Sequence, residues 1–522
     1  MFGGLVEVRP LPLAGFLLGV YVVAWFIQAA LMDYRIAKRG GGGVKAPRVA
    51  SNMITAGIWF FWAGWRQMRN DLLSLYNSVY DKHGTPESPN CVEITLTTPG
   101  VRFILTREPE HVKTILTSKF SDFGKGYHFH KIWSPFLGDS IFTTDGQLWH
   151  DSRSLIRPMF IKEKVRDLDI FDRWTNEMIN LLPPPGQSVD IANLLYRMTL
   201  DVTTDFLLGE SVNALRDEHN EFAYYFNEIQ RIQMMLTILV PAAPFLPRHR
   251  YYAGIKYIEK FMAPFIEQAL ALPPDELEKL SKTDKDFTFL HNIARYSRDR
   301  KVIRDQIMAV LLAGRDTTAA TLSWTIYELC NKPEVVKRLR QEILRVVGPF
   351  GNKPTYENLK ELKYLTHIIN ETLRIYPAVP YNIRAALEDS SLPSPDGKPS
   401  IAVLKGDIVV YSALSMQRRK DIYPEVSETF PDPAVYCPER WEHWTPKPWT
   451  YVPFNGGPRI CVGQNFAMTE MAYVLVLIFQ KFDRIEYCGD WDAQYHKAEI
   501  VGAPGHGVPV TLYPAVDDQV KE

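Results

Sequence analysis

A single cysteine in a glycine-rich loop near the carboxyl end of the chain has the setting of a metal ligand. The stretch 454–463 places Cys461 among glycine and proline residues and is followed by an apolar run. A lone axial thiolate binds haem iron and favours cleavage of the O–O bond. Glycines let backbone amides approach the sulfur, where hydrogen bonds can set its basicity. The alternative is a buried free cysteine, the commonest fate of an isolated one.

The residues around this cysteine follow an ordered pattern. Phe-x-x-Gly-x-Arg-x-Cys-x-Gly is met at Phe454, Gly457, Arg459, Cys461 and Gly463. The pattern resembles the haem loop of the cytochrome P-450 haem-thiolate monooxygenases. The resemblance implies haem b as the cofactor, with Cys461 as the axial ligand of the iron. It also implies that Phe454, Gly463 and Arg459 lie beside the haem, with Arg459 against a propionate.

A polar cluster interrupts the long apolar helix predicted from Ile303. Its sequence, Ala-Gly-Arg-Asp-Thr-Thr at 313–318, puts small residues where a diatomic ligand needs room. Thr317 can hydrogen-bond to bound dioxygen, and Asp316 can relay protons from solvent. Alternatively, threonine bonds back to a helix carbonyl and only bends the helix. The hexapeptide resembles the family's oxygen-activation motif, which implies catalytic roles for Asp316 and Thr317. Some members of the family carry a glutamate that links covalently to the haem at the position of Ala313. The alanine here implies haem without a covalent link.

An acid and a base on another predicted helix face each other, because residues three apart share a helix face. A local ion pair on a solvated surface would explain Glu371 and Arg374. The resemblance adds Arg440, which precedes the cysteine loop in the stretch Pro-Glu-Arg-Trp, as the third member of a structural triad. Such a buried network specifies geometry, so we expect loss of one member to release haem rather than to alter specificity.

A tryptophan and an arginine four residues apart, Trp149 and Arg153, share a face of a further predicted helix. Arginine suits planar carboxylates, so the pair could grip a haem propionate, whereas a solvated basic face is the alternative. The family's Trp-x-x-x-Arg pattern favours haem contact. The same resemblance implies Arg384 and Arg459 as further propionate partners.

The resemblance covers the chain from about residue 91 to 513, with the motifs in the family's order. It is closest to the fungal branch of alkane and fatty-acid hydroxylases, through the stretches 416–419 and 451–461. That branch usually has histidine where Gln417 stands. The resemblance implies oxidation of a lipophilic substrate, either a fatty acid or alkane or a fungal secondary metabolite.

The composition describes a globular protein. Its 522 residues are 46% hydrophobic and 23% charged, and a net charge of −1 gives no case for nucleic-acid binding. This length permits one large enzyme domain or several domains. The five cysteines form no CxxC pair, which indicates a reducing compartment. No second Cys or His lies at ligand spacing from Cys461, which disfavours zinc.

The uncharged segment 11–32 is long enough to cross a membrane once. As a helix it would span roughly 33 Å, against a hydrocarbon core of about 30 Å. A cleaved signal peptide is the alternative, but the apolar run is too long for one and its basic residues follow it. Basic residues from Arg35 to Arg48 place the bulk of the chain in the cytosol by the positive-inside rule. We therefore expect a single-pass protein of the endoplasmic reticulum membrane, with a lumenal amino terminus.

A glycine run at 40–43 predicts a flexible hinge, and the segment 54–65 after it is short, apolar and rich in aromatic residues. Such a segment lies at a membrane interface or packs as a core helix rather than spanning. The chain is therefore divided into a membrane anchor at 1–33, a hinge and interfacial helix at 34–85, and a haem-thiolate catalytic domain at 86–522.

Periodicity predicts a mainly α chain with small β-sheets, an α+β class. Alternating residues at 92–96 and 102–105 predict a hairpin, and strands return at 401–412 and near 508–513. Helical periodicity is found at 165–182, 191–208, 221–236, 252–272, 303–329, 334–347, 359–375 and 464–482. With the family resemblance, this implies the cytochrome P-450 fold and a single N-terminal transmembrane helix.

The expected substrate cavity is mostly apolar. Its predicted lining residues lie on the polar helix and just after the 371–374 helix turn: Val310, Leu311, Ala313, Thr317, Ala378, Val379 and Pro380. The stretches 123–136 and 236–246 are predicted to be lids, and the second is apolar enough to enter a membrane. Ordinary core packing explains any of these residues equally well. We expect a lipophilic substrate that arrives from the bilayer.

The sequence shows no flavin or nicotinamide domain, since no GxGxxG follows a strand. Electrons must then come from another protein. The resemblance implies an NADPH–cytochrome P-450 reductase, with cytochrome b5 as a second candidate. An acidic reductase face could meet Arg153, Arg157, Lys162 and Lys164, although such charges are often only solvated.

The patterns together predict a membrane-bound haem monooxygenase that uses dioxygen. A haem-thiolate isomerase or peroxide-using enzyme is one alternative, but it would not need the proton relay of Asp316 and Thr317. The other is a haem sensor or lipid-binding protein without turnover. Oxygen and NADPH consumption with a supplied reductase separates these classes.

Overall fold

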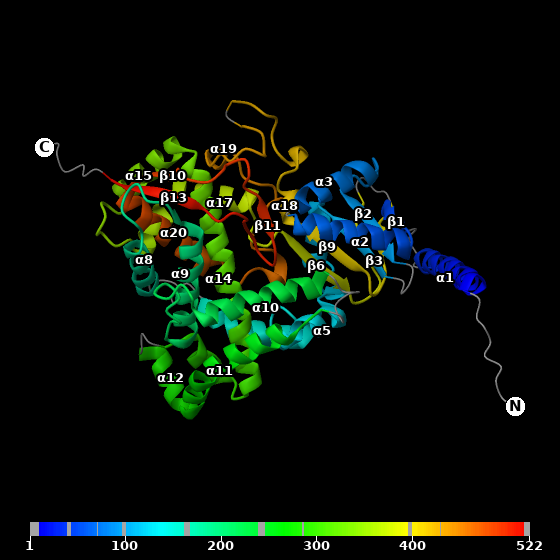
Figure 1. Ribbon diagram of the computed structural model, residues 1–522, viewed down its shortest axis with the longest axis horizontal. Helices are drawn as coiled ribbons and strands as arrows, with labels where there is room; N and C mark the ends of the chain where they lie inside the picture. The colour runs from blue at the N-terminus through cyan, green and yellow to red at the C-terminus, as the bar shows by residue number, and fades with distance from the viewer. Residues whose placement is uncertain are drawn as a thin grey trace. The chain divides into compact units, whose positions relative to one another are not determined.

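The chain forms a mainly helical protein with small β-sheets, as predicted (Figure 1). The structure is a computed structural model. It describes residues 10–38, 43–69, 71–96, 101–160, 168–238, 246–283, 287–394, 399–428 and 430–515. The chain divides into two compact units. The first draws on Met1–Met68, Leu72–Gly124 and Asn382–Ser412, and the second on Arg69–Asp71, Lys125–Tyr381 and Ala413–Glu522.

The first unit contains a six-stranded sheet in the order β1-β2-β3-β9-β6-β4. Its strands are β1 (Arg48–Ala50), β2 (Cys91–Leu96), β3 (Val101–Thr106), β4 (Phe123–Gly124), β6 (Tyr381–Ala386) and β9 (Ile408–Ser412). The predicted hairpin is the antiparallel pair β2 and β3, with Ile94 opposite Phe103, and its turn falls outside the described residues. A smaller pair joins β7 (Ser390–Leu392) to β8 (Ile401–Val403). The helices of this unit are α1 (Pro10–Lys38), α2 (Met53–Met68), α3 (Leu72–His83) and α4 (Pro109–Leu116).

Helix α1 is long and apolar enough to span a membrane over Leu13–Lys38, where the mean hydropathy is 1.9. Its last turns also pack on the first unit, since Met32 and Ile36 form a buried cluster with Ala402 and Leu404. The indole of Trp25 donates to the Ser51 carbonyl at 3.1 Å. The predicted hinge at 40–43 falls, except for Gly43, outside the described residues. These contacts attach α1 to the first unit.

Helix α2 is the short apolar segment predicted at 54–65. One face packs on the sheet of the same unit through Ala56, Trp59, Phe60 and Ala63. The other face leaves large apolar side chains exposed: Met53, Ile54, Ile58, Phe61, Trp62 and Met68. Its sequence predicted either a core helix or a helix at the membrane interface. One face of α2 packs in the core, and the other exposes apolar side chains that suit a membrane interface.

The second unit is mostly helical. Its helices are α5 (Gly126–Leu137), α6 (Gly146–Ile156), α8 (Asp169–Asn180), α9 (Ile191–Leu208), α10 (Glu221–Ile238), α11 (His249–Ala271), α12 (Pro274–Thr283), α13 (Phe289–Tyr296), α14 (Arg300–Cys330), α15 (Pro333–Val346), α16 (Tyr356–Glu361), α17 (Lys363–Ile375), α18 (Ala413–Met416), α19 (Arg440–His443) and α20 (Gln464–Lys481). A three-stranded sheet contains β10 (Phe482–Tyr487), β13 (Pro509–Pro514) and β5 (Val189–Asp190), and β11 (His496–Ala498) pairs with β12 (Gly502–Pro504).

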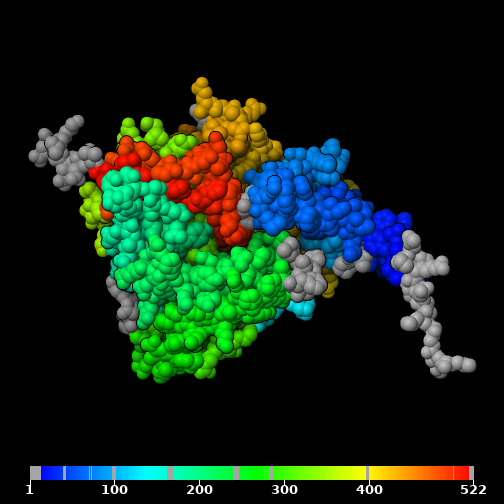
Figure 2. All heavy atoms as spheres, in the orientation of Figure 1, coloured from blue at the N-terminus to red at the C-terminus, as the bar shows by residue number. Residues whose placement is uncertain are grey.

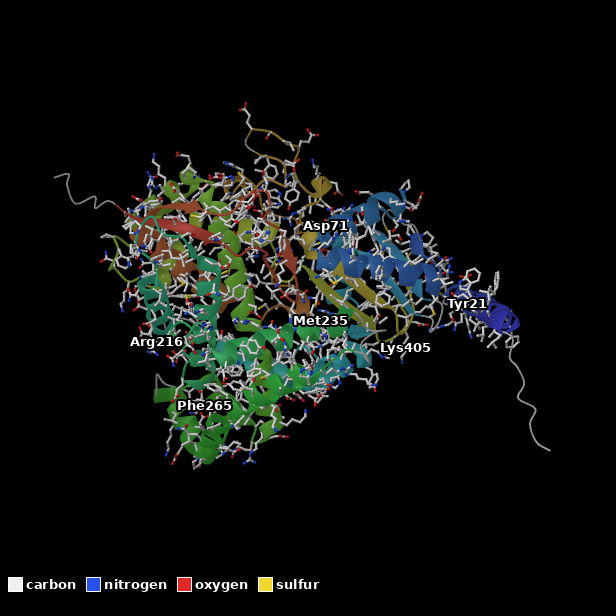
Figure 3. All side chains as sticks on the ribbon, in the orientation of Figure 1. Tyr21, Asp71, Arg216, Met235, Phe265 and Lys405 are labelled. Atoms are coloured by element: carbon white, nitrogen blue, oxygen red, sulfur yellow. The ribbon has the colours of Figure 1, made fainter. Side chains whose placement is uncertain are left out.

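Helix α14 runs through the core of this unit. Its carboxyl half packs with α17 and α20 in one apolar cluster, and its amino half packs with α10, α11 and α13 in another. Met235 of α10 and Phe265 of α11, both labelled in Figure 3, pack against the second cluster. Most of α14 is buried from Ile303 to Leu329, which includes several polar residues. Any polar group within α14 must therefore find a partner inside the protein.

Candidate active site

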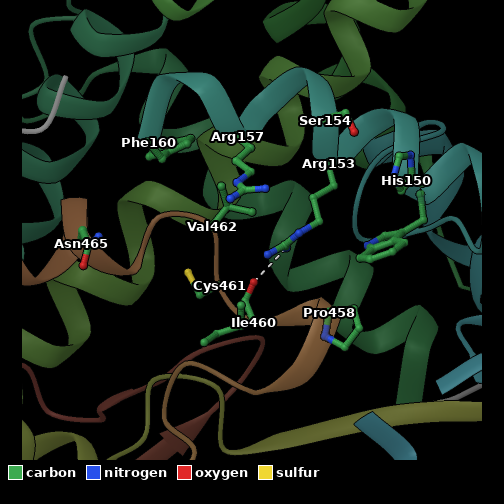
Figure 4. A pocket seen from close by; sticks show the side chains of 11 residues that line it. His150, Arg153, Ser154, Arg157, Phe160, Pro458, Ile460, Cys461, Val462 and Asn465 are labelled. Carbon is green, nitrogen blue, oxygen red and sulfur yellow. Dashed lines mark hydrogen bonds between the residues drawn. The ribbon is translucent and has the colours of Figure 1, made fainter. Parts of the chain in front are cut away.

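Cys461 lies between a short 3-10 helix, Gly457–Arg459, and the start of α20. Its amide donates to the Phe454 carbonyl at 2.9 Å, which closes the loop on itself. The side chain has exposed surface that opens on a cavity of about 690 Å³ (Figure 4). The cavity is lined by Trp149, His150, Arg153, Ser154, Arg157, Phe160, Pro458, Ile460, Cys461, Val462 and Asn465. The loop and α6 thus form two walls of one site.

The pKa of the Cys461 thiol reflects two opposing influences. Burial by the surrounding protein raises its pKa, while the Gly463 backbone and the Arg153 guanidinium oppose that rise. No group of three or more His, Cys, Asp or Glu side chains that could hold a metal ion occurs among the described residues. The donor set therefore fits a metal that brings its other ligands with it, as haem iron does. The cavity beside the lone thiol of Cys461 therefore fits a haem group.

Helix α6 places the predicted Trp149 and Arg153 on the cavity wall. Arg153 donates to the Ile460 carbonyl at 2.9 Å, the dashed line in Figure 4, and its guanidinium lies 5.9 Å from the Trp149 ring. Arg157 lines the same cavity, whereas Lys162 and Lys164 fall outside the described residues. Arg153 is therefore oriented toward the cysteine loop.

Arg459 is tied to the end of the turn before α6. It donates to the Asp145 carboxylate at 2.7 Å and to the Thr144 carbonyl at 3.0 Å, and its guanidinium stacks 4.8 Å from the Trp149 ring. Asp145 also accepts from the Gly126 amide at the start of α5, at 2.8 Å. The guanidinium thus joins the cysteine loop to α5 and α6, and its contact with a haem propionate stays a prediction.

Three other predicted haem contacts occupy different settings. Phe454 packs against the main apolar cluster, and a β-carbon on Gly463 would lie 3.6 Å from the Phe160 ring. Arg384 lies on β6 and, buried, donates to the Asn382 side chain at 2.6 Å. The haem roles of all three stay predictions.

The polar cluster of α14 does not break the helix. The Thr317 hydroxyl donates to the Ala313 carbonyl at 2.8 Å, which is the back-bond considered as the alternative. Gly314 faces α9, where an added β-carbon would lie 3.0 Å from the Thr203 hydroxyl, so its small size serves helix packing. Ala313 and Thr317 are both half-buried.

Asp316 is buried beside Arg315. One carboxylate oxygen lies 3.3 Å from the Arg315 guanidinium, and the other has no hydrogen-bond partner among the described residues. Burial raises the pKa of Asp316, although Arg315 and the Gln230 side chain favour its charged form. A buried carboxylate with a spare oxygen can take up and release a proton.

Glu371, Arg374 and Arg440 meet as predicted, and all three are fully buried. Glu371 accepts from Arg374 at 2.7 and 2.8 Å and from Arg440 at 2.9 Å. Burial would raise the pKa of Glu371, but the two guanidinium groups outweigh it and hold the pKa below its ordinary value. Gln417 joins this network to the chain before the cysteine loop, since it donates to the Arg374 carbonyl at 3.0 Å and accepts from the Val452 amide at 2.9 Å.

Three of the predicted pocket residues have different surroundings. Val310 is buried in an apolar cluster, and Ala378 packs against Ala320 and Val501. Val379 is 38% exposed. The first predicted lid becomes β4 and α5, and the second falls mostly outside the described residues beyond Ile238. The lining of a substrate cavity therefore stays a prediction.

Sequence reasoning missed Glu470 on α20. It is 1% exposed, one carboxyl oxygen has no hydrogen-bond partner among the described residues, and burial raises its pKa to about 8, against the effect of Thr318. The signal was available, because Glu470 is a single acid in the otherwise apolar stretch that follows Cys461. Its interaction with Thr318 places this carboxyl group beside the polar cluster of α14.

Comparison with known proteins decides the family. A family model described as Cytochrome P450 matches residues 59–493. The chain belongs to the cytochrome P450 family. It is 45% identical over 434 residues to cytochrome P450 monooxygenase pvhE of Talaromyces variabilis, covering 79% of this chain and 80% of that protein. It is 39% identical over 432 residues to cytochrome P450 52A1 of Candida tropicalis, covering 78% and 77% respectively.

The fold of the family is matched as well. The haem domain of cytochrome P450DA, a solved crystal structure, superposes with a TM-score of 0.70 at 20% identity, covering 86% of this chain and 93% of that chain. The predicted cytochrome P450 fold and the resemblance to fungal members are confirmed. The protein is a haem-dependent monooxygenase, and its cofactor is haem whose iron a cysteine thiolate binds.

Proposed function

We propose that this cytochrome P450 is anchored in the endoplasmic reticulum membrane and oxidises a lipophilic substrate, with electrons from a separate NADPH–cytochrome P450 reductase. The substrate is a fatty acid, an alkane or a fungal secondary metabolite. The reaction inserts one atom of dioxygen into the substrate, reduces the other to water, and consumes NADPH and a proton. The observation that carries this proposal is a lone thiol, Cys461, opening on a cavity walled by α6 and the cysteine loop.

Cys461 is proposed as the axial ligand, with Arg153 beside it. Haem bound there supplies the activation of dioxygen and the transfer of one oxygen atom. Arg153 faces the sulfur and opposes the rise in its pKa, which favours the thiolate that a metal requires. Trp149 and Arg153 share the cavity wall, where a carboxylate of the haem would find a cation and an aromatic edge.

Asp316 and Thr317 are proposed to supply protons on α14. Since the Thr317 hydroxyl gives its only proton to the Ala313 carbonyl, its oxygen is left to accept a hydrogen bond. Asp316, with one oxygen unpartnered, can carry a proton from the outside of the helix cluster to that position.

Two substitutions test this assignment in the full-length protein with reductase. Cys461→Ser is expected to abolish the red-shifted Soret band of the ferrous carbon-monoxide complex, and an unchanged band would refute the ligand. Thr317→Ala is expected to retain haem but to divert electrons to peroxide. Thr321→Ala is the matched control, because Thr321 makes the same back-bond one turn further along, to the Thr317 carbonyl at 2.8 Å.

The substrate class is tested by spectral titration with alkanes, fatty acids and aromatic polyketides. We expect binding spectra with apolar ligands, and spectra with hydrophilic molecules alone would contradict a lipophilic substrate. Full haem loading with no coupled product from any member of the panel, despite oxygen and NADPH being supplied, would instead favour a sensor.

The membrane proposal depends on α1 and on the exposed face of α2. Arg35 and Lys38 lie in the last turn of α1, and by the positive-inside rule they support a cytosolic location for the rest of the chain. Deleting residues 1–33 is expected to release only part of the protein from microsomes, since the exposed side chains of Phe61 and Trp62 on α2 can still enter the membrane. The further changes Phe61→Ser and Trp62→Ser should release the remainder. Full retention on microsomes after the deletion and both substitutions would refute the membrane proposal.

A further inference from the structure

Asp316 faces a specific set of groups on neighbouring elements. Its side chain is only 7% exposed, and Arg315 of the same helix pairs with it. Arg315 in turn donates to the Asn227 side chain of α10 at 2.6 Å and lies 5.4 Å from the Tyr196 ring of α9. Gln230, also on α10, favours the charged form of Asp316. The acid is therefore enclosed by α9, α10 and α14 with one oxygen left over.

The turn that joins β11 to β12 is fixed against the same stretch of α14. The Trp324 indole donates to the Gly502 carbonyl at 3.1 Å, and the Gly502 amide donates to the Ala378 carbonyl at 3.0 Å. Val501 packs on Ala320, which lies one helical turn beyond Asp316 and on the same face. These contacts hold the turn against α14 about one helical turn from Asp316.

Glu499 lies in this turn and reaches solvent. Its side chain is 45% exposed and pairs with Lys497 at 3.0 Å, and its amide donates to the Val501 carbonyl at 3.2 Å. Its negative charge acts on Asp316, Tyr196 and the Arg231 side chain of α10. In Figure 2 the red C-terminal strands reach the surface next to the green atoms of the α10 region. Glu499 thus stands at the outer edge of the cluster that encloses Asp316.

We propose that Glu499 is the entry point for the protons that Asp316 delivers. In this relay, which depends on the proposed role of Asp316, the Glu499 carboxylate takes a proton from solvent water and releases it to the Asp316 carboxylate. Asp316 then passes a proton toward Thr317 and returns to its ionised form. Each transfer leaves the donor ready for another proton, so no other reactant is needed.

The other groups around Asp316 are less suited to this step. Arg315 stays charged, because a guanidinium does not release its proton in proteins. Burial, followed by the charge of Asp316, raises the pKa of Tyr196, so its hydroxyl is a poor proton donor. Gln230 and Asn227 do not titrate. Glu499 is a carboxylate whose charge raises the pKa of Asp316, and it lies in the turn that packs on α14.

Three variants of the full-length protein, assayed with reductase and a substrate that gives coupled product, test the proposal. Glu499→Gln is expected to lower product formation about tenfold at unchanged haem content and to increase the solvent isotope effect on turnover. Glu499→Asp should restore most of the rate. Lys497→Gln is the control, because it removes the ion-pair partner of Glu499 but keeps the Glu499 carboxylate.

An infrared titration separates a proton-entry role from a structural one. The infrared band of the Asp316 carboxyl group is identified as the one that disappears in Asp316→Asn. In Glu499→Gln the midpoint of the pH titration of this band should move to lower pH, because a negatively charged neighbour has been removed. Unchanged turnover in Glu499→Gln, with product lost in Asp316→Asn, would overturn Glu499 as the entry point while leaving the relay. Full turnover in both variants would refute the relay itself. Equal losses in Glu499→Gln and Lys497→Gln, with no shift of the midpoint, would show that the turn only supports α14.

Discussion

Two buried carboxylates of the same unit, Glu371 and Asp316, have arginine partners but differ in how completely they are bonded. Glu371 accepts from Arg374 and Arg440, from the Trp441 indole at 3.0 Å and from the Cys437 amide at 2.8 Å. Asp316 has one ion-pair contact, at 3.3 Å, and an oxygen with no partner among the described residues. A saturated carboxylate is fixed in place and in charge, whereas an unsaturated one can exchange a proton.

The two carboxylates also differ in what they connect. Glu371 joins α17 to α19 and to Cys437, so we propose that it supports the chain that leads into the cysteine loop. Asp316 interacts with Gln230 of α10 and with the charge of Glu499, which lies in the turn between β11 and β12 and is exposed to solvent. Burial alone therefore does not distinguish these two acids, whereas the number of bonded carboxylate oxygens does.

The largest effect is expected from Glu371→Gln. Removing one partner leaves two buried guanidinium groups without their counter-charge, which costs about 3–5 kcal/mol. We expect loss of haem and a lower melting temperature, measured as the haem-to-protein ratio and by calorimetry. Glu361→Gln is the control, because its pair with Arg345 is exposed and contributes about 0–1 kcal/mol. Equal stability of the two variants would contradict the scaffold role.

The pH dependence of stability adds a second measure of Glu371. Its pKa is lower in the folded protein than the ordinary value of 4.5, so the unfolded chain binds the proton more tightly. The stabilisation is complete above 4.5 and is lost as the pH falls through the folded value. Glu371→Gln should lack this acid-dependent loss, and an unchanged pH profile would argue against the network.

A smaller effect on stability but a large one on turnover is expected from Asp316→Asn. The amide keeps the size of the side chain, so haem content and melting temperature should stay near those of the natural protein. Product formation should fall about 100-fold, since loss of a proton donor typically costs 10²–10⁴. Haem loss comparable to that of Glu371→Gln would show that Asp316 has a structural role. The proposed difference between the two carboxylates would then be wrong.

The smallest effect is expected from Glu470→Gln. The pKa of Glu470 is raised to about 8, so its stabilisation is complete below 4.5 and is lost as the pH rises toward 8. At pH 8 the variant should be more stable by about 1–2 kcal/mol, less than the pKa difference implies because the amide also leaves a hydrogen bond unmade. Denaturation at pH 5 and pH 8 measures this, and a variant less stable at both values would show that Glu470 is charged and paired.

Local patterns were sufficient to predict most helices and the pairs that lie on one helix. Glu371 with Arg374, and Trp149 with Arg153, are neighbours because residues three or four apart share a helix face. The predicted strands 92–96 and 102–105 became β2 and β3 by the same local logic of alternation. The cavity residues after the 371–374 turn could not be predicted, since packing of distant elements buries Ala378 against Val501 and leaves Val379 exposed.

The sequence by itself determined the family, the cysteine loop and the identity of the acid in α14, because each is a short pattern whose spacing fixes its own geometry. Only the tertiary structure decided that Arg459 meets Asp145 and that Gly314 faces α9. It alone placed the β11–β12 turn, through Val501, against α14 at Ala320. These contacts join residues far apart in the chain, and which of them meet depends on how whole helices and hairpins pack.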